Sequence, residues 1–245
     1  ANGLYTSLAY NFLDKTEASS IEAEISGDAY DRNPDFGNVS RAVLSPSLYG
    51  NRHRIVGSLN KRFAYAGDKL ATSIGLFFQY AQGGRFSYTY SGDINRDGSS
   101  LNDLILIPSE SQLAEMNFVS EDQRRAYGNF IEQDEYLREN RGRYAERYAI
   151  LSPWFSNWDL RIAQDFKVGT DNNVQFTIDI LNFGNLLSSE WGVRQFPTNT
   201  QPVGVSFNDQ GEPVYSFDPE LTSTFTNDFS LLSRWQMQLG LRYSF

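Results

Sequence analysis

The sequence has no cysteine and a single histidine, His53, in 245 residues. The absence of cysteine excludes a disulfide framework, thiol catalysis and thiolate metal sites. The sequence also lacks a nucleophile–histidine–acid set, a phosphate loop and paired catalytic carboxylates, so we expect no enzyme. No run approaches the roughly 18 apolar residues of a membrane helix. The net charge of −9 argues against nucleic acid as a partner.

What the sequence does have is aromatic residues and strands with one apolar face. Aromatic residues make up 15% of the chain, which favours sheets and interfaces. Residues 234–245 alternate strictly between apolar and polar side chains, which predicts a β-strand with one apolar face. Trp235 and Tyr243 lie toward the two ends of that face, with aliphatic side chains between them. This order is typical of a strand that crosses a bilayer, where aromatic rings sit at headgroup level.

Similar alternation predicts an all-β, antiparallel fold with six strands. The predicted strands span residues 4–13, 52–65, 70–82, 154–167, 173–183 and 234–245. Short turns alternate with long loops at about 14–51, 84–152 and 186–233. All short turns therefore fall at one end and all long loops at the other, which is typical of outer-membrane β-barrels. The alternative is a soluble β-sandwich, which has no physical need for this asymmetry.

Six strands are too few for a closed barrel, because the smallest membrane barrels need about eight. Open edges in lipid leave backbone groups without hydrogen bonds. We therefore expect other strands to complete the barrel, either through oligomerisation or because the chain is the C-terminal part of a larger one. The sequence shows no signal peptide, so we expect a mature product or a piece of something longer.

The two faces of such strands have different expected surroundings. We expect a membrane girdle of aromatic side chains at Tyr10, Phe12, Phe63, Tyr65, Trp158, Phe166, Trp235, Tyr243 and Phe245. We expect charged side chains to face a wet lumen or a plug at Arg54, Arg62, Asp159, Arg161, Asp165, Asp179 and Arg242. Mutual pairing of those charges is the simpler interpretation of the second set.

The long loops carry weaker signals. Residues 93–152 predict an irregular region, solvated because 93–139 holds 11 acidic residues against four arginines. Within it, a capping-box pattern at 120–123 and an amphipathic stretch at 130–140 predict short helices. Alternation through Phe86, Tyr88 and Tyr90 predicts an extension of the third strand. Residues 203–207 and 214–217 predict a small hairpin.

Three further features are candidate functional sites. Asp93, Asn95, Asp97 and Asp103 resemble a Ca²⁺ loop, because oxygen ligands alternate before a glycine. The twelfth position, where a closing acid belongs, is a leucine, so a metal-free Asx/Gly turn is the alternative. For His53, an interfacial role is the interpretation we prefer over catalysis. We expect the four tryptophans to lie in the girdle or at the base of the loops; the alternative is an aromatic platform for a ligand. They are Trp154, Trp158, Trp191 and Trp235.

Several blocks also resemble a known family. They are Arg52–Leu59, Phe86–Gly98 with Asn102–Ile105, Arg141–Arg147 with Pro153-Trp154 and Trp158–Arg161, and Leu181–Leu187 with Trp191-Gly192. Together they resemble the C-terminal barrel of TonB-dependent outer-membrane transporters, in the Bacteroidota-type Oar-like and SusC-like branch. The blocks are spread over 52–245, whereas 14–50 carries no such motif.

The resemblance implies more than the strands themselves. It implies the last six strands of a barrel of about 22, closed by a plug that is absent from this chain. It implies a TonB complex as partner, outer-membrane lipid around the barrel, external loops, a periplasmic C-terminus and sometimes a surface lipoprotein. The expected function is active uptake of a nutrient such as an oligosaccharide, a peptide or a metal chelate. The alternatives are a passive porin-type channel and a soluble carbohydrate-binding or adhesin module.

Overall fold

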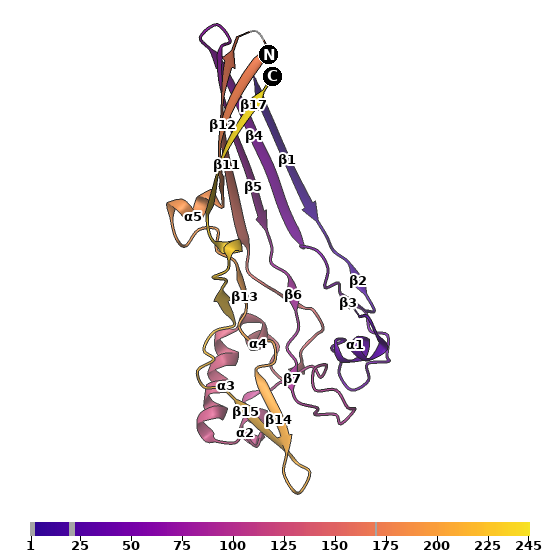
Figure 1. The fold of residues 1–245 in the computed structure, drawn as a ribbon. Coiled ribbons are helices and arrows are strands. Elements are labelled where there is room, and N and C mark those ends of the chain that lie inside the picture. Colours follow the sequence, from indigo (N-terminus) through magenta and orange to yellow (C-terminus); the bar gives the residue numbers. More distant parts are fainter. Residues whose placement is uncertain (1–2, 20–22, 170) are drawn as a thin grey trace.

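The computed structural model describes residues 3–19, 23–169 and 171–245. Its main element is an antiparallel sheet in the order β1-β4-β5-β11-β12-β17. The strands are β1 (Leu4–Phe12), β4 (His53–Tyr65), β5 (Leu70–Ala81), β11 (Phe155–Val168), β12 (Asn172–Leu181) and β17 (Gln236–Ser244). Figure 1 shows this sheet at one end of an elongated molecule and the folded loops at the other.

The sheet is open. Its edge strands are β1 and β17. Each pairs with one neighbour, β4 or β12, and among the described residues no strand pairs with the outer side of either one. The prediction of a mostly β, antiparallel fold is confirmed, with about 43% of residues in strands and 16% in helices. A closed barrel is not formed by this chain alone. No helix of the described residues is long and apolar enough to cross a membrane.

Short connections lie at the end where both termini are found (Figure 1). Between β4 and β5, Ala66, Gly67 and Asp68 all have positive φ angles, of 56°, 66° and 62°. This left-handed run reverses the chain within four residues. Between β11 and β12, Gly169 has φ of 75°. The rest of that predicted turn includes residue 170, which lies outside the described residues.

The other end holds three long connections with short helices and strands. The first contains β2 (Thr16–Glu17), α1 (Ser26–Asp31) and β3 (Ser45–Pro46). The second contains β6 (Arg85–Phe86), β7 (Tyr90–Ser91), β8 (Leu106–Ile107), α2 (Glu110–Glu115), α3 (Glu121–Gln133), α4 (Glu135–Glu139), β9 (Arg143–Tyr144) and β10 (Ile150–Leu151). The third contains α5 (Phe183–Leu187), β13 (Gln195–Pro197), β14 (Val203–Phe207), β15 (Pro213–Phe217), β16 (Phe225–Asn227) and the 3₁₀ turn η1 (Leu231–Ser233).

These connections pack into one unit, which we call the loop body (residues 23–51, 84–152 and 193–230). Strand β14 pairs with β15 and lies parallel to β7 of another connection. A backbone bridge joins Asp35 to Asp103, and another joins Phe118 to Tyr215. The pairing of β14 with β15 confirms the predicted hairpin at 203–207 and 214–217. The helix after Ser120 is also confirmed, and the Ser120 side chain accepts a hydrogen bond from Gln123 N at 3.3 Å.

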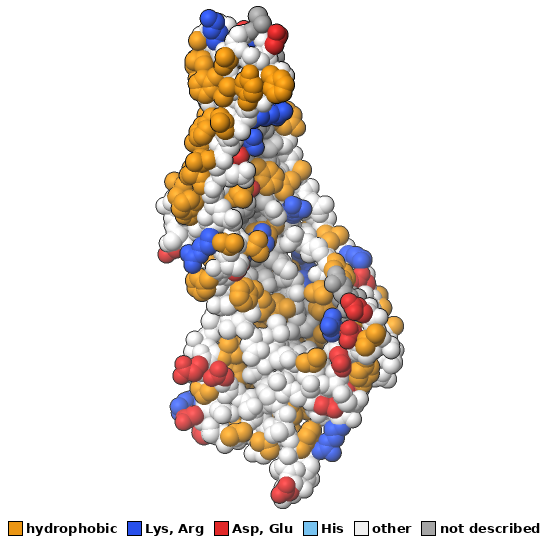
Figure 2. Space-filling model, in the orientation of Figure 1, with side chains coloured by type: hydrophobic (Ala, Val, Ile, Leu, Met, Phe, Trp, Pro, Cys, Tyr) orange, Lys and Arg blue, Asp and Glu red, His pale blue; other side chains and the backbone are white. Residues whose placement is uncertain are grey.

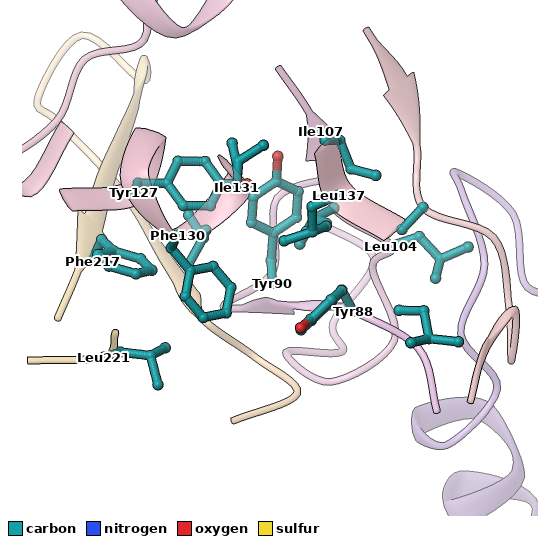
Figure 3. Packing of buried hydrophobic residues seen from close by; sticks show 14 of the residues in the cluster. Tyr88, Tyr90, Leu104, Ile107, Tyr127, Phe130, Ile131, Leu137, Phe217 and Leu221 are labelled. Atoms are coloured by element: carbon teal, nitrogen blue, oxygen red, sulfur yellow. The ribbon is translucent and has the colours of Figure 1, made fainter. Parts of the chain in front are cut away.

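The expectation of an irregular, solvated region at 93–152 was wrong. The loop body holds the largest hydrophobic core cluster of the described residues, formed by Phe86, Tyr88, Tyr90, Leu104, Ile105, Ile107, Tyr127, Phe130, Ile131, Leu137, Ala145, Ile150, Val203, Phe217 and Leu221. Figure 3 shows side chains of α3 facing Phe217 and the tyrosines of 88–90. Many acidic side chains lie on the surface of this unit (Figure 2), whereas Asp35, Asp103 and Asp134 are buried.

The predicted extension of the third strand is confirmed as far as Phe86, because β6 pairs with β10 in the register in which β5 pairs with β11, whereas Tyr88 lies outside the strands. Strand β5 ends at Ala81, and Tyr88 is fully buried in the loop body. At Gly83 the two chain segments lie close together, since a Cβ there would lie 2.5 Å from Ser152 Cβ. The chain can pass this point only without a side chain.

Candidate functional site

One face of the sheet is apolar across all six strands, and we call it the apolar face. The strand register aligns Leu59 with Leu76, Leu76 with Leu160, Leu160 with Ile180 and Ile180 with Met237. Unlike the loop-body core, most of this face is at least partly exposed among the described residues, although Ile180 is buried. Leu8 is 73% exposed and Leu239 is 63% exposed. Exposed apolar surface of this extent marks contact with a membrane or another protein.

Aromatic side chains border the apolar face at both ends. The loop end carries Tyr10, Phe12, Trp158 and Trp235, and the turn end carries Phe63, Tyr65, Phe166, Tyr243 and Phe245. All nine residues expected in the girdle therefore share one face. Hydrophobic side chains are prominent over the narrow sheet end in Figure 2.

His53 lies among the aromatic rings at the loop end of the apolar face. Its Nδ1 is 2.8 Å from the hydroxyl of Tyr10. Its ring stacks on Trp154 with centroids 5.7 Å apart, and Trp154 stacks in turn on Tyr80 at 4.7 Å. The histidine is thus a member of an aromatic cluster, with no nucleophile beside it among its described contacts.

Three polar groups near the turn end of the apolar face are hydrogen-bonded to one another. The hydroxyl of Thr72 donates to Gln164 Oε1 at 2.6 Å, and the Tyr65 hydroxyl donates to the same oxygen at 3.1 Å. Lys61 holds its ammonium group 5.4 Å from the centroid of Phe63. Paired in this way, these groups are less costly to place beside an apolar medium.

The opposite face, which we call the polar face, carries all seven charged residues predicted to face a lumen. Arg62 pairs with Asp165 at 3.4 Å and Arg161 with Asp179 at 3.2 Å. Asp159 accepts hydrogen bonds from Asn157 Nδ2 and Asn182 N, both at 2.9 Å. Mutual pairing therefore accounts for four of these residues, and hydrogen bonds to asparagines account for Asp159.

Arg54 and Arg242 complete the polar face. Among the described residues, neither guanidinium group has a hydrogen bond or an ion pair. They lie on β4 and β17, the second strand and the last strand of the sheet order. Both remain open to a partner on the polar side of the sheet.

Buried polar side chains tie the loop body together. Asp134 accepts hydrogen bonds from Leu137 N at 2.9 Å, from the Tyr88 hydroxyl at 2.9 Å and from Thr224 Oγ1 at 2.6 Å. It thus caps α4 and links residues of two different connections. Burial, with the nearby Asp134 carboxylate, raises the pKa of Tyr88 well above its ordinary value. The tyrosine therefore stays a hydrogen-bond donor throughout the physiological pH range.

Arg147 joins the first connection to the second. Its guanidinium donates to Asn33 Oδ1 at 2.5 Å, to Ser45 Oγ at 2.8 Å and to the carbonyl of Ala18 at 2.9 Å, and also to the carbonyl of Val43. The side chain is buried. One arginine thus satisfies acceptors spread over residues 18–45, a segment with little secondary structure of its own.

Replacing Arg147 by methionine is expected to release residues 23–46 from the loop body. The buried acceptors would lose a charged donor, which costs about 3 kcal/mol in total. Hydrogen–deuterium exchange of this segment should accelerate about 100-fold. The matched control is Arg143→Met, since Arg143 is exposed on the neighbouring strand. Equal protection in both variants would contradict this role for Arg147.

The Asp93 loop forms a network of its own. Asp93 accepts from Asp97 N at 3.0 Å and Gly98 N at 2.8 Å, and Asp103 accepts from Ile94 N at 3.0 Å and from Asn95 Nδ2 at 2.6 Å. Burial raises the pKa of Asp103. Within the described residues, no group of three or more acidic or histidine side chains is arranged to hold a metal. The geometry fits the Asx/Gly turn, and Ca²⁺ binding stays a prediction.

Several residues of this site carry no clear local signal in the sequence. Asp134 and Arg147 stand in a charged stretch that resembles any solvated loop, and their partners are 46 to 129 residues away. Helix α2 could have been found, because Ser109 and Gln112 form a complete capping box at its start. The strand predicted to residue 183 ends at Leu181, because Asn182 is left-handed with φ of 52°.

Comparison with known proteins bears on this architecture. Part of the chain is similar to a TonB-dependent transporter. The relative is the TonB-dependent transporter Oar of Myxococcus xanthus, 28% identical over 111 residues, which cover 38% of this chain and 10% of the relative. The similarity supports the TonB-dependent transporter group but not the narrower Bacteroidota branch, given that organism. No protein-family model and no solved structure matches the chain.

Proposed function

We propose that this chain supplies the last six strands and three external loops of an outer-membrane barrel of about 22 strands, which takes up a nutrient with TonB-derived energy. In this arrangement the apolar face contacts lipid and the polar face lines the lumen or contacts a plug. The loops lie outside the cell and the C-terminus in the periplasm. The chain acts in transport and not in catalysis.

The observation that carries the proposal is the division of the sheet into two faces and two ends. The apolar face has aliphatic rows bordered by aromatic rings at both ends, which matches the hydrocarbon core and the two interfaces of a bilayer. The short turns lie at one end and the loop body at the other. The open edges β1 and β17 fit strands supplied by the rest of the barrel, since lipid provides no hydrogen-bond partner.

The loop body supports a role in substrate capture. A cleft of about 400 Å³ lies between the first and second connections. The rings of Phe36 and Tyr144 contact each other at its border, and Arg41 and Glu146 also line it. Aromatic rings beside charged groups suit an oligosaccharide or a peptide better than a purely apolar ligand. The proposal also includes a substrate, a plug, the TonB complex and a surface lipoprotein as partners.

Uptake by cells that carry the full-length protein tests the function. Accumulation of a labelled oligosaccharide, peptide or metal chelate is expected to stop when a protonophore collapses the inner-membrane proton gradient. A porin-type channel would continue to equilibrate the same solute. Uptake that is unaffected by the protonophore would therefore favour the passive channel. Recovery of the full-length protein in water without detergent would remove the membrane assignment altogether.

A further inference from the structure

Helix α5 folds back over the apolar face of the sheet. It begins directly after the left-handed Asn182 and packs against β11. A Cβ on Gly184 would lie 3.9 Å from Cδ1 of Trp158, one of the aromatic side chains at the loop end of the apolar face. This is an ordinary van der Waals distance, so the helix backbone at residue 184 lies beside that indole. Figure 1 shows α5 projecting sideways where the strands meet the loops.

Buried asparagines fix the position of this short helix. Asn185 Nδ2 donates to the carbonyls of Ser189 at 3.2 Å and Trp191 at 3.0 Å, and its Oδ1 accepts from Trp235 N at 3.3 Å. Asn182 Nδ2 donates to the Gly192 carbonyl at 3.0 Å. A helix of five residues has little stability by itself, so these bonds determine its orientation.

Three large apolar side chains of α5 and its following turn are exposed, beside the exposed Ser189 and Glu190. Leu187 is 62% exposed, Trp191 is 59% exposed and Leu186 is 38% exposed. We call these three residues the α5 knob. A rigid helix that holds two leucines and a tryptophan in the open needs an apolar or interfacial partner.

The topology limits what that partner is. Strand β11 lies inside the sheet, between β5 and β12. Additional barrel strands can pair only with the edges β1 and β17, so they extend the sheet sideways and leave the face over β11 uncovered. A plug would contact the polar face, on the other side. The knob is instead continuous with the apolar face, at the level of its loop-end aromatic rings.

We propose that the α5 knob inserts at the boundary between headgroups and acyl chains of the outer leaflet, where it sets the depth of the barrel. This inference rests on the proposed membrane placement. Trp and Leu on a short helix held in place by the hydrogen bonds of Asn182 and Asn185 suit this boundary. The knob thus extends the lipid contact beyond the strands and onto a loop.

Single cysteine labels test this inference, because the chain itself has no cysteine. The full-length protein, with any cysteine elsewhere replaced by serine, would be reconstituted in phospholipid vesicles. Spin labels would be placed at Leu187→Cys, at Leu239→Cys on the apolar face and at Val119→Cys in the loop body. Val119 is 64% exposed and serves as the aqueous reference. The measurement is collision with oxygen, which concentrates in lipid, against collision with a water-soluble nickel chelate.

The label at 187 is expected to favour oxygen over the nickel chelate, at a shallower depth than the label at 239. A label at 187 that behaves like the one at 119, while 239 lies in lipid, would overturn the knob and leave the barrel intact. Shielding of 187 from both reagents would indicate a protein partner and would also overturn it. Exposure of 239 to the nickel chelate would instead contradict the membrane placement itself.

Discussion

Replacing Leu239 by arginine is expected to destabilise the protein in a bilayer by about 2–4 kcal/mol. Leu239 lies midway along β17, aligned with Ile178 in the centre of the apolar face. In the proposed placement its side chain touches acyl chains near the bilayer midplane. An arginine there loses its hydration, and it has no carboxylate on its own face to compensate. Urea titration of the full-length protein in vesicles, followed by heat-modifiable gel migration, measures the change.

Two further arginine variants separate lipid from other apolar surroundings. Gln238→Arg changes the adjacent residue on the polar face, aligned with Asp179, and is expected to have little effect. Phe245→Arg lies at the turn end, where the penalty should fall to about 0–1 kcal/mol because the headgroup region is hydrated. A protein core imposes no such dependence on depth. Equal destabilisation at 239 and 245 would therefore argue that protein, and not lipid, covers the apolar face.

The sheet could be predicted from the sequence because its signal is local. A period of two assigns each side chain to a face, and the register then follows from the short turns. For this reason all nine aromatic and all seven charged residues share the faces expected of them. Closure could not be derived, because in the proposed barrel it depends on strands beyond these six. The number 22 came from the resemblance alone.

The loop body could not be predicted from the sequence because its contacts are remote. The tilted rings of Phe130 and Phe217 have centroids 5.5 Å apart, although 86 residues separate them along the chain. Charge composition was misleading here, since acidic residues on the outside conceal aromatic ones within. Helix α5 is a second example, because Gly184 lies next to Trp158, a residue of β11 that is distant in the sequence. Local periodicity carries no information about such partners.

The second large effect is expected from Phe130→Ala in α3. Phe130 is buried, and its ring packs against Phe217 and edge-on against Tyr88. Truncation of such a ring removes apolar contacts and leaves a cavity, which costs about 3–5 kcal/mol. Since the core belongs to loops, the loss should fall on the loop body and spare the six-stranded sheet. Limited proteolysis of intact vesicles is expected to cleave 84–152 much faster, while heat-modifiable migration stays unchanged.

Val119→Ala is the matched control, since Val119 is largely exposed in the same connection. It should leave protease resistance at the level of the unmodified protein. If Phe130→Ala also abolished heat-modifiable migration, the loop body and the sheet would form one cooperative unit, and their separation would be wrong. If it changed neither property, the cluster around Phe130 would not stabilise the loops. Loss of resistance alone would mean that the loop body is a folded unit, so that in the proposed function a substrate meets a preformed surface and not a flexible chain.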